Sequence, residues 1–386
     1  MKIQSNRISW IDNTKHVAIF CVVLGHSFSL IKGDFCGYED FNLFIVAFNM
    51  PLFALLSGIT SYKSLTQICT LRDLSAYLNK VSWHIGVPTV VYTLIAMSVG
   101  YGMQCRWNRC LISIVLTVIV CSLIYLLEFS KFDNKFLKTK KLFPYLILPV
   151  CIVNQSVWYF VYVILSLFLA SLSALPANNL RRYKLLAFCI IFGLGSIIIA
   201  RYSPFFSTVE FYLPFVIGYL YSSKNGLEKF SNRPIVLIVL ALGECIIGFI
   251  AFLNYYSVEN QFYLLDYVQA IESGHISIFF IRQISAIALA VSIVFIIQAI
   301  SNSYNMFSYI GAMTLGIYPI HSEIIGIAKN YIGKISTNNA VLDMLFVFLL
   351  AIVLMIVSIF IIRYLRKSQY CCLVFLGDRY NNELKI

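Results

Sequence analysis

Charge is scarce in this sequence. Of its 386 residues only 12% are Asp, Glu, Lys or Arg, whereas 60% are hydrophobic. A soluble domain is typically about 45–50% apolar, and a larger apolar share at this length could not be buried away from water. The composition therefore excludes an ordinary water-soluble enzyme and predicts a surface that faces lipid.

Metal-binding and nucleic-acid-binding signals are also lacking. The 11 cysteines are scattered through apolar stretches without CxxC or Cys/His spacing, so we expect small hydrophobic side chains and no metal site. The net charge of +12 does not predict a nucleic-acid partner, because basic residues of membrane proteins usually lie in cytoplasmic loops.

Long apolar runs recur along the whole chain, from Lys15 to Arg363. A bilayer core about 30 Å thick requires about 20 apolar residues per helix, so we predict an all-α, polytopic transmembrane helix bundle of about ten to twelve spans. The first run has no small-residue cleavage site and should remain as the first span. The expected spans are 15–31, 42–62, 82–101, 110–127, 142–154, 157–175, 185–200, 208–222, 235–254, 276–300, 308–328 and 341–362.

Lysine and arginine are concentrated in alternate connecting segments. With the N-terminus inside, the basic segments 63–80, 131–141 and 363–367 all lie on the cytoplasmic side. The positive-inside rule then places both termini in the cytoplasm. We predict one transmembrane domain over 1–366 and a short cytoplasmic tail over 367–386.

Ionisable residues within spans are functional candidates, because they are costly to place in lipid. His26 lies eleven positions after Lys15, on nearly the same face of a helix and roughly 16 Å along it at about 1.5 Å per residue. Asp12 precedes Lys15 by three residues and lies near that face. The face therefore runs from a charged cytoplasmic mouth to a histidine in the membrane. A structural histidine below a snorkelling lysine is an equally weighted alternative.

A second histidine, His321, lies at a similar depth in the expected span 308–328. Tyr318, three residues earlier, and Thr314 lie on the same face as His321. Two histidines at matched depth suggest a shared polar pocket. A neutral imidazole there could act as a general base toward a hydroxyl, although one histidine could simply orient the other.

Several other features of the spans have structural explanations. We expect Asn49-Met50-Pro51 to break the second helix and Gly58 to permit close helix packing. For Arg282 and Glu210 we favour structural pairing over catalysis.

Taken in order, these motifs resemble the acyltransferase family 3 membrane proteins. Arg7-x-x-Trp10-Ile11-Asp12-x-x-Lys15 leading to Gly25-His26-Ser27 is similar to the first-helix signature of that family. Asn49-Met50-Pro51 through Ser57-Gly58 resembles its second-helix pattern. Looser similarities at 158–160, 211–218 and 315–321 extend the resemblance over nearly the whole chain.

The resemblance implies transfer of an acyl group, usually acetyl from cytoplasmic acetyl-CoA, to hydroxyls of surface carbohydrates. It identifies His26 as the essential histidine and Lys15 as the basic partner near the donor, and on this hypothesis His321 would orient or assist. Arg7, Asp12 and Tyr318 would contribute to the substrate and donor site. Family members often carry paired arginines before the third helix, where this chain has Lys80 and His84. These two residues would bind the donor phosphates, although lysine lacks the bidentate grip of arginine.

The resemblance also implies partners and a location. We expect no bound cofactor, with acetyl-CoA as the acyl donor, a carbohydrate acceptor, the lipid bilayer and glycan-assembly proteins as partners. The enzyme would be a multi-pass protein of the bacterial cytoplasmic membrane that modifies capsule, O-antigen or exopolysaccharide sugars. No fused hydrolase-like domain is evident after the last span. The alternative is a polytopic transporter or glycan flippase without acyl transfer, which many spans and basic loops fit equally well.

Overall fold

The structure is a computed structural model of the chain. It describes residues 8–30, 38–129, 158–180, 183–202, 207–223, 233–258, 274, 276–301, 308–332 and 339–377. All regular structure in these segments is helical, as predicted from composition. Within lipid a helix satisfies its own backbone hydrogen bonds, which explains why an apolar chain adopts this class of fold.

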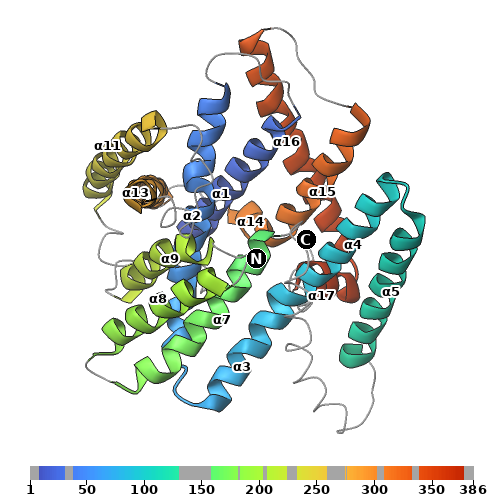
Figure 1. Ribbon diagram of the computed structural model, residues 1–386, viewed down its shortest axis with the longest axis horizontal. Coiled ribbons are helices and arrows are strands. Elements are labelled where there is room, and N and C mark those ends of the chain that lie inside the picture. The colour runs from blue at the N-terminus through green and yellow to red at the C-terminus, as the bar shows by residue number, and fades with distance from the viewer. Residues whose placement is uncertain are drawn as a thin grey trace.

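The helices follow the expected spans closely (Figure 1). Each expected span overlaps a helix, except 142–154, which lies outside the described residues. In chain order the helices are α1 (Ser9–Phe28), α2 (Tyr38–Leu65), α3 (Leu71–Val81), the π-helical turn η1 (Ser82–Gly86), α4 (Val87–Met103), α5 (Trp107–Phe129), α7 (Trp158–Asn178), α8 (Lys184–Tyr202), α9 (Ser207–Ser223), α11 (Pro234–Val258), α13 (Ile276–Ile300), α14 (Ser308–Gly311), α15 (Thr314–Ile332), α16 (Ala340–Leu365) and α17 (Gln369–Leu376).

Six helical stretches of the described residues are long and apolar enough to cross a membrane. They are Phe41–Leu65, Leu71–Met103, Trp107–Tyr125, Pro234–Tyr255, Ile276–Ile300 and Val341–Leu365. Two shorter apolar helices cover Val163–Asn178 and Lys184–Ile198. The protein is therefore a polytopic helical membrane protein, while the total of about ten to twelve spans and the orientation of the termini remain predictions.

Helix α1 lies at the centre of the bundle. It packs against α2, α13, α14, α15 and α16 (Figure 1). In contrast, only 11% of the apolar window of α5 and 22% of that of α11 are buried within the protein, against 61% for α2. Because their exposed residues are apolar, α5 and α11 have lipid-facing surfaces, and chemistry is expected near α1.

The second helix is continuous, so the expected break at Asn49-Met50-Pro51 is wrong. Helix α2 runs through Pro51 without interruption. A proline removes only one backbone donor from a helix. The side-chain oxygen of Asn49 also accepts a hydrogen bond from the backbone nitrogen of Met50 (2.6 Å), which adds a local polar contact beside the proline.

Close packing of α2 at Gly58 is confirmed. A Cβ atom at Gly58 would overlap the carbonyl oxygen of Phe215 in α9, and a Cβ atom at Gly218 would overlap the carbonyl oxygen of Leu55 in α2. Reciprocal glycines thus let the two backbones touch, as small residues do in membrane helix pairs.

The third expected span begins earlier than predicted, with the amphipathic helix α3. Thr70 and Asp73 form a capping box at its start, which satisfies backbone donors that the first turn leaves unpaired. After α3 the chain widens into η1, where the backbone nitrogen of Val87 donates to the carbonyl of Ser82. Pro88 has no N–H to donate to the carbonyl of His84, four residues earlier, and this missing donor favours the irregular turn.

The segment after the last span folds back onto the bundle. Ser368 caps α17 by accepting a hydrogen bond from Cys371, and Cys372, Leu373, Val374 and Leu376 are buried. Helix α17 packs against α4, η1, α15 and α16. The division at residue 366 stays a prediction, but residues 369–376 are part of the packed structure.

Candidate active site

His26 and His321 meet in the interior of the bundle. Nδ1 of His26 lies 3.0 Å from Nε2 of His321, and the two rings are stacked with centroids 5.1 Å apart. The two residues come from α1 and α15 and are 295 positions apart in the sequence. The two histidines expected at matched depth therefore contact each other directly.

The hydrogen bonds order the protons of this pair. Nδ1 of His321 lies 2.8 Å from the carbonyl oxygen of Ile317, and because a carbonyl only accepts, this nitrogen carries the hydrogen. In a neutral His321 ring, Nε2 is then the acceptor, and Nδ1 of His26 donates to it. The lone pair of His26 is therefore on Nε2.

The two histidines differ in accessibility. His321 is fully buried, with 0% of its surface exposed, whereas His26 is only partly buried. Of the two, only His26 therefore has exposed surface. The arrangement suits His26 as the reacting base and His321 as the residue that orients it.

A cavity of about 420 Å³ lies on the side of this pair toward Lys15. Four of the predicted site residues line it, namely Lys15, Lys80, His84 and Tyr318. These residues come from α1, α3, η1 and α15, so the tertiary structure gathers cationic groups that are distant in sequence. An anionic ligand would be attracted to such a mouth.

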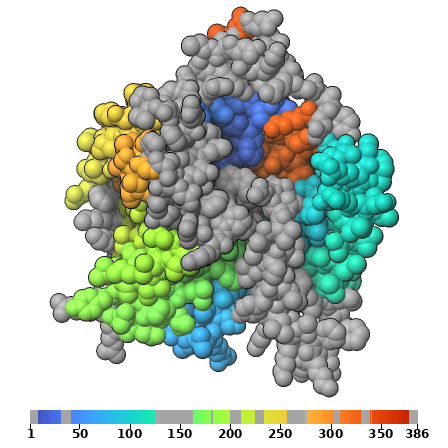
Figure 2. All heavy atoms as spheres, viewed as in Figure 1, coloured from blue at the N-terminus to red at the C-terminus, as the bar shows by residue number. Residues whose placement is uncertain are grey.

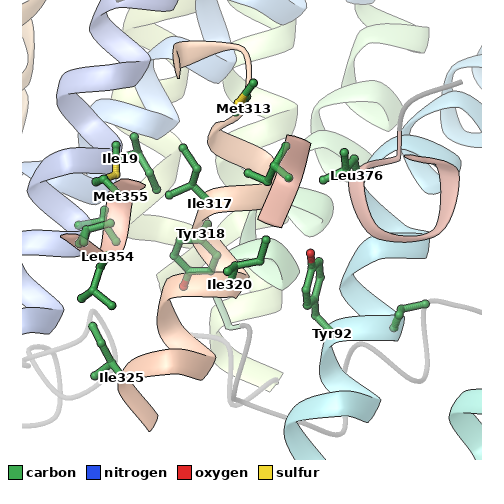
Figure 3. Packing of buried hydrophobic residues seen from close by; sticks show 14 of the residues in the cluster. Ile19, Tyr92, Met313, Ile317, Tyr318, Ile320, Ile325, Leu354, Met355 and Leu376 are labelled. Atoms are coloured by element: carbon green, nitrogen blue, oxygen red, sulfur yellow. The ribbon is translucent and has the colours of Figure 1, made fainter. Parts of the chain in front are cut away.

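Tyr318 connects the cavity to the histidines. It lines the cavity, and its ring meets the ring of His321 edge-on with centroids 5.8 Å apart. Figure 3 shows Tyr318 on α15 between Ile317 and Ile320. Neither histidine itself lines the cavity, so Tyr318 is the group that lies between the cavity and the pair.

Two further predicted residues are placed differently. Asp12 is buried and does not line the cavity, but its carboxylate lies 3.5 Å from Nζ of Lys15. Asp12 therefore helps to position the lysine instead of facing the cavity. Arg7 lies outside the described residues.

His84 and Lys80 occupy the mouth of the cavity. Both side chains are exposed, and they lie on successive turns of the α3–η1 segment. The ring of His84 is oriented by the carbonyl oxygen of Gly377, which accepts a hydrogen bond from Nδ1 at 3.0 Å.

Sequence reasoning missed a row of hydroxyl groups on α2. Ser57, Thr60, Ser61 and Ser64 all line the cavity. Their spacing of i, i+3, i+4 and i+7 places them on one helix face, so the periodicity of polar residues was a usable signal. Leu376 of α17 also lines the cavity, and no sequence pattern indicated this.

Arg282 and Glu210, for each of which structural pairing is favoured over catalysis, pair with each other, a partnership that the sequence did not indicate. Nη1 of Arg282 lies 3.1 Å from Oε1 of Glu210, which joins α13 to the start of α9. Both side chains are mostly buried, and this contact accounts for two charged groups in the apolar part of the chain without a catalytic role.

The histidine pair and all the named cavity residues except Leu376 lie in the part of the chain that matches a known domain. A profile described as an acyltransferase domain matches residues 8–364. No significant match to a curated protein or to a solved structure was found. Since the match covers nearly the whole chain and includes both histidines, this protein belongs to acyltransferase family 3 and is a membrane acyltransferase.

Proposed function

We propose that this acyltransferase moves an acetyl group from cytoplasmic acetyl-CoA to a hydroxyl of a cell-surface or lipid-linked carbohydrate, in the cytoplasmic membrane of a bacterium. The observation that carries the proposal is the contact between Nδ1 of His26 and Nε2 of His321, which leaves Nε2 of His26 free to react.

In direct transfer, Nε2 of His26 accepts the proton of the acceptor hydroxyl as its oxygen attacks the thioester carbon. The new C–O bond forms, the C–S bond breaks, and the departing thiolate receives the proton from His26. The imidazolium formed in between is stabilised by its hydrogen bond to His321. If the enzyme carries the acetyl group itself, the same nitrogen is the nucleophile, so Nε2 is the reacting atom by either route.

The cavity supports the donor assignment. Its mouth, where the cations Lys15 and Lys80 lie beside His84, suits the phosphates of a nucleotide-linked thioester, while the hydroxyl row on α2 can bind amide and phosphate oxygens. The thioester end would then lie toward Tyr318 and the histidines. Arg7 and Asp12 would support this site from the start of the chain.

The test is acetylation of the surface glycan. Cells with the wild-type gene should carry O-acetyl groups, detected by NMR or mass spectrometry of the purified glycan, and cells with His26→Ala should lack them. The variant protein must remain in the membrane fraction. Unchanged acetylation in the variant would refute the role of His26.

Acyl transfer is favoured over the transporter or flippase alternative by membership of the acyltransferase family. Transfer of labelled acetyl from acetyl-CoA in purified membranes tests the donor directly. Glycan-assembly proteins would supply the acceptor and form the expected partners.

A further inference from the structure

Helix α11 contains one charged residue, Glu244, in the middle of its apolar stretch. The span Pro234–Tyr255 has no other Asp, Glu, Lys or Arg, and Glu244 lies ten positions from its first residue and eleven from its last. At about 1.5 Å per residue, the carboxyl group is about 15 Å from either end of the span. A carboxyl group at this depth is costly without a polar partner, so Glu244 is expected to have one.

The partner is not found within the described part of the chain. No described residue forms an ion pair or a hydrogen bond with Glu244, whose side chain is only partly buried. Helix α11 packs mainly against α13, and the buried serines of α13 already donate their hydrogens elsewhere. Ser285 donates to the carbonyl of Gly248 at 2.9 Å. Ser292 donates to the carbonyl of Leu289 at 2.8 Å. The partner of Glu244 is therefore expected outside the chain.

Glu244 lies on a surface of α11 that we call the Glu244 stripe, formed by Leu240, Glu244, Ile247 and Ala251. The spacings of four, three and four residues place the stripe along one side of the helix, as in the contact seam of two packed helices. Leu240 and Ile247 are 41% and 52% exposed, and the other two residues are partly exposed. Helix α11 also lies at the edge of the bundle (Figure 1). The stripe is therefore accessible to another membrane helix.

A second copy of the same chain fits this stripe. Copies of one chain insert into the membrane with the same orientation, so a two-fold axis along the membrane normal brings their Glu244 residues together at equal depth. Neutral carboxyl groups are self-complementary, because each has an O–H that donates and an oxygen that accepts. A different protein would need a polar group at the same depth, and lipid tails offer no hydrogen-bonding group at all.

We propose that the protein forms a homodimer through the Glu244 stripe, in which the two Glu244 carboxyl groups hydrogen-bond to each other across the two-fold axis. The apolar members of the stripe pack around this contact, and the carboxyl pair fixes the register of the two helices. The inference does not depend on the proposed function, because no residue of α11 lines the cavity described above.

The first test is the oligomeric state of the full chain in liposomes, measured by single-molecule photobleaching at several protein densities. The wild type should form dimers. Glu244→Leu removes the hydrogen bonds and should weaken dimerisation about tenfold, whereas Glu244→Gln keeps a donor and an acceptor and should remain within about threefold of the wild type. A wild type that stays monomeric at every density, or a Glu244→Leu variant that dimerises as well as the wild type, would overturn the inference.

Disulfide cross-linking tests the same surface with Glu244 intact. Ile246 and Ile247 are neighbours and are 60% and 52% exposed, but only Ile247 lies on the stripe. In a chain whose native cysteines are replaced, Ile247→Cys should cross-link two copies when membranes are oxidised with copper phenanthroline, and Ile246→Cys should not. Equal cross-linking of both variants, or none from Ile247→Cys, would overturn the inference. A cross-link from Ile247→Cys to a chain of different mass would do the same, because the partner would be another protein.

Discussion

At the scale of single residues, one carbonyl group determines the protonation of two histidines. The carbonyl of Ile317 fixes the hydrogen on Nδ1 of His321, and His321 in turn fixes the hydrogen on Nδ1 of His26. His26 and His321 could be recognised from the sequence, because histidines within apolar spans are rare. Which nitrogen of His26 carries the lone pair could not be predicted, since it depends on a contact between helices far apart in the chain.

This chain of hydrogen bonds predicts that His321 is needed for its acceptor nitrogen. His321→Leu removes the acceptor and should lower kcat for acetyl transfer by about 10²-fold, in the range typical of acid–base groups. His321→Gln keeps a side-chain oxygen that can accept from His26 and should retain several times more activity. The measurement is transfer of labelled acetyl from acetyl-CoA in purified membranes, and equal activity of the two variants would contradict the proton arrangement.

Lys15 should act on donor binding and not on the chemical step. Its ammonium lines the cavity and is positioned by Asp12, so Lys15→Met should raise KM for acetyl-CoA about tenfold or more through loss of a charged hydrogen bond, with little change in kcat. Lys63→Met is the control, because Lys63 is exposed on α2 and is not among the residues that line this cavity. A fall in kcat without a change in KM would remove Lys15 from the donor site.

At the scale of elements, glycines set how closely the helices approach. Gly58 of α2 and Gly218 of α9 each meet the carbonyl of the facing helix, and Gly311 of α14 meets that of Asp12 in α1. The sequence indicated close packing at Gly58 but not the partner helix. Similarly, Pro51 predicted a break that α2 does not have, because local propensity is overridden by packing along the rest of a long helix.

The α2–α9 contact should therefore be sensitive to a single methyl group. Gly58→Ala should destabilise the protein by about 1–3 kcal/mol, because the backbones must separate to admit the added atom. Thermal unfolding in detergent measures the change as a fall in melting temperature. Gly243→Ala in α11, where a Cβ meets nothing within 4 Å, should leave the melting temperature unchanged or slightly higher. Equal stability of the Gly58→Ala variant would show that the helices do not touch there.

At the scale of the whole molecule, the distribution of charge predicts the orientation in the membrane. Basic segments such as 63–80 should lie in the cytoplasm, on the side of the proposed donor. The cavity mouth contains Lys80 and so should open on that side. In the view of Figure 2, the surfaces of α4 and α5 (cyan), α1 (blue) and α15 (orange-red) are visible on the same face of the molecule.

Two native cysteines can test this orientation. Cys69 precedes α3 and Cys105 lies in the α4–α5 turn, and both are free and exposed. In variants that keep only one of them, a membrane-impermeant maleimide should label Cys105 in intact cells and label Cys69 only after permeabilisation. The opposite pattern would invert the topology and place the cavity mouth outside the cell.

The sequence by itself determined the membrane class, the helices and the two histidines, because apolar runs and buried ionisable residues are local features that hydropathy exposes. It also carried the family resemblance, which the domain match confirms. Only the tertiary structure decided that His26 meets His321, that Lys15, Lys80, His84 and Tyr318 share a cavity, and that Leu376 of α17 also lines it. These relations join segments far apart in the sequence, such as His26 and His321, which are 295 positions apart. They depend on helix packing angles and close glycine contacts, which no periodicity along the chain encodes.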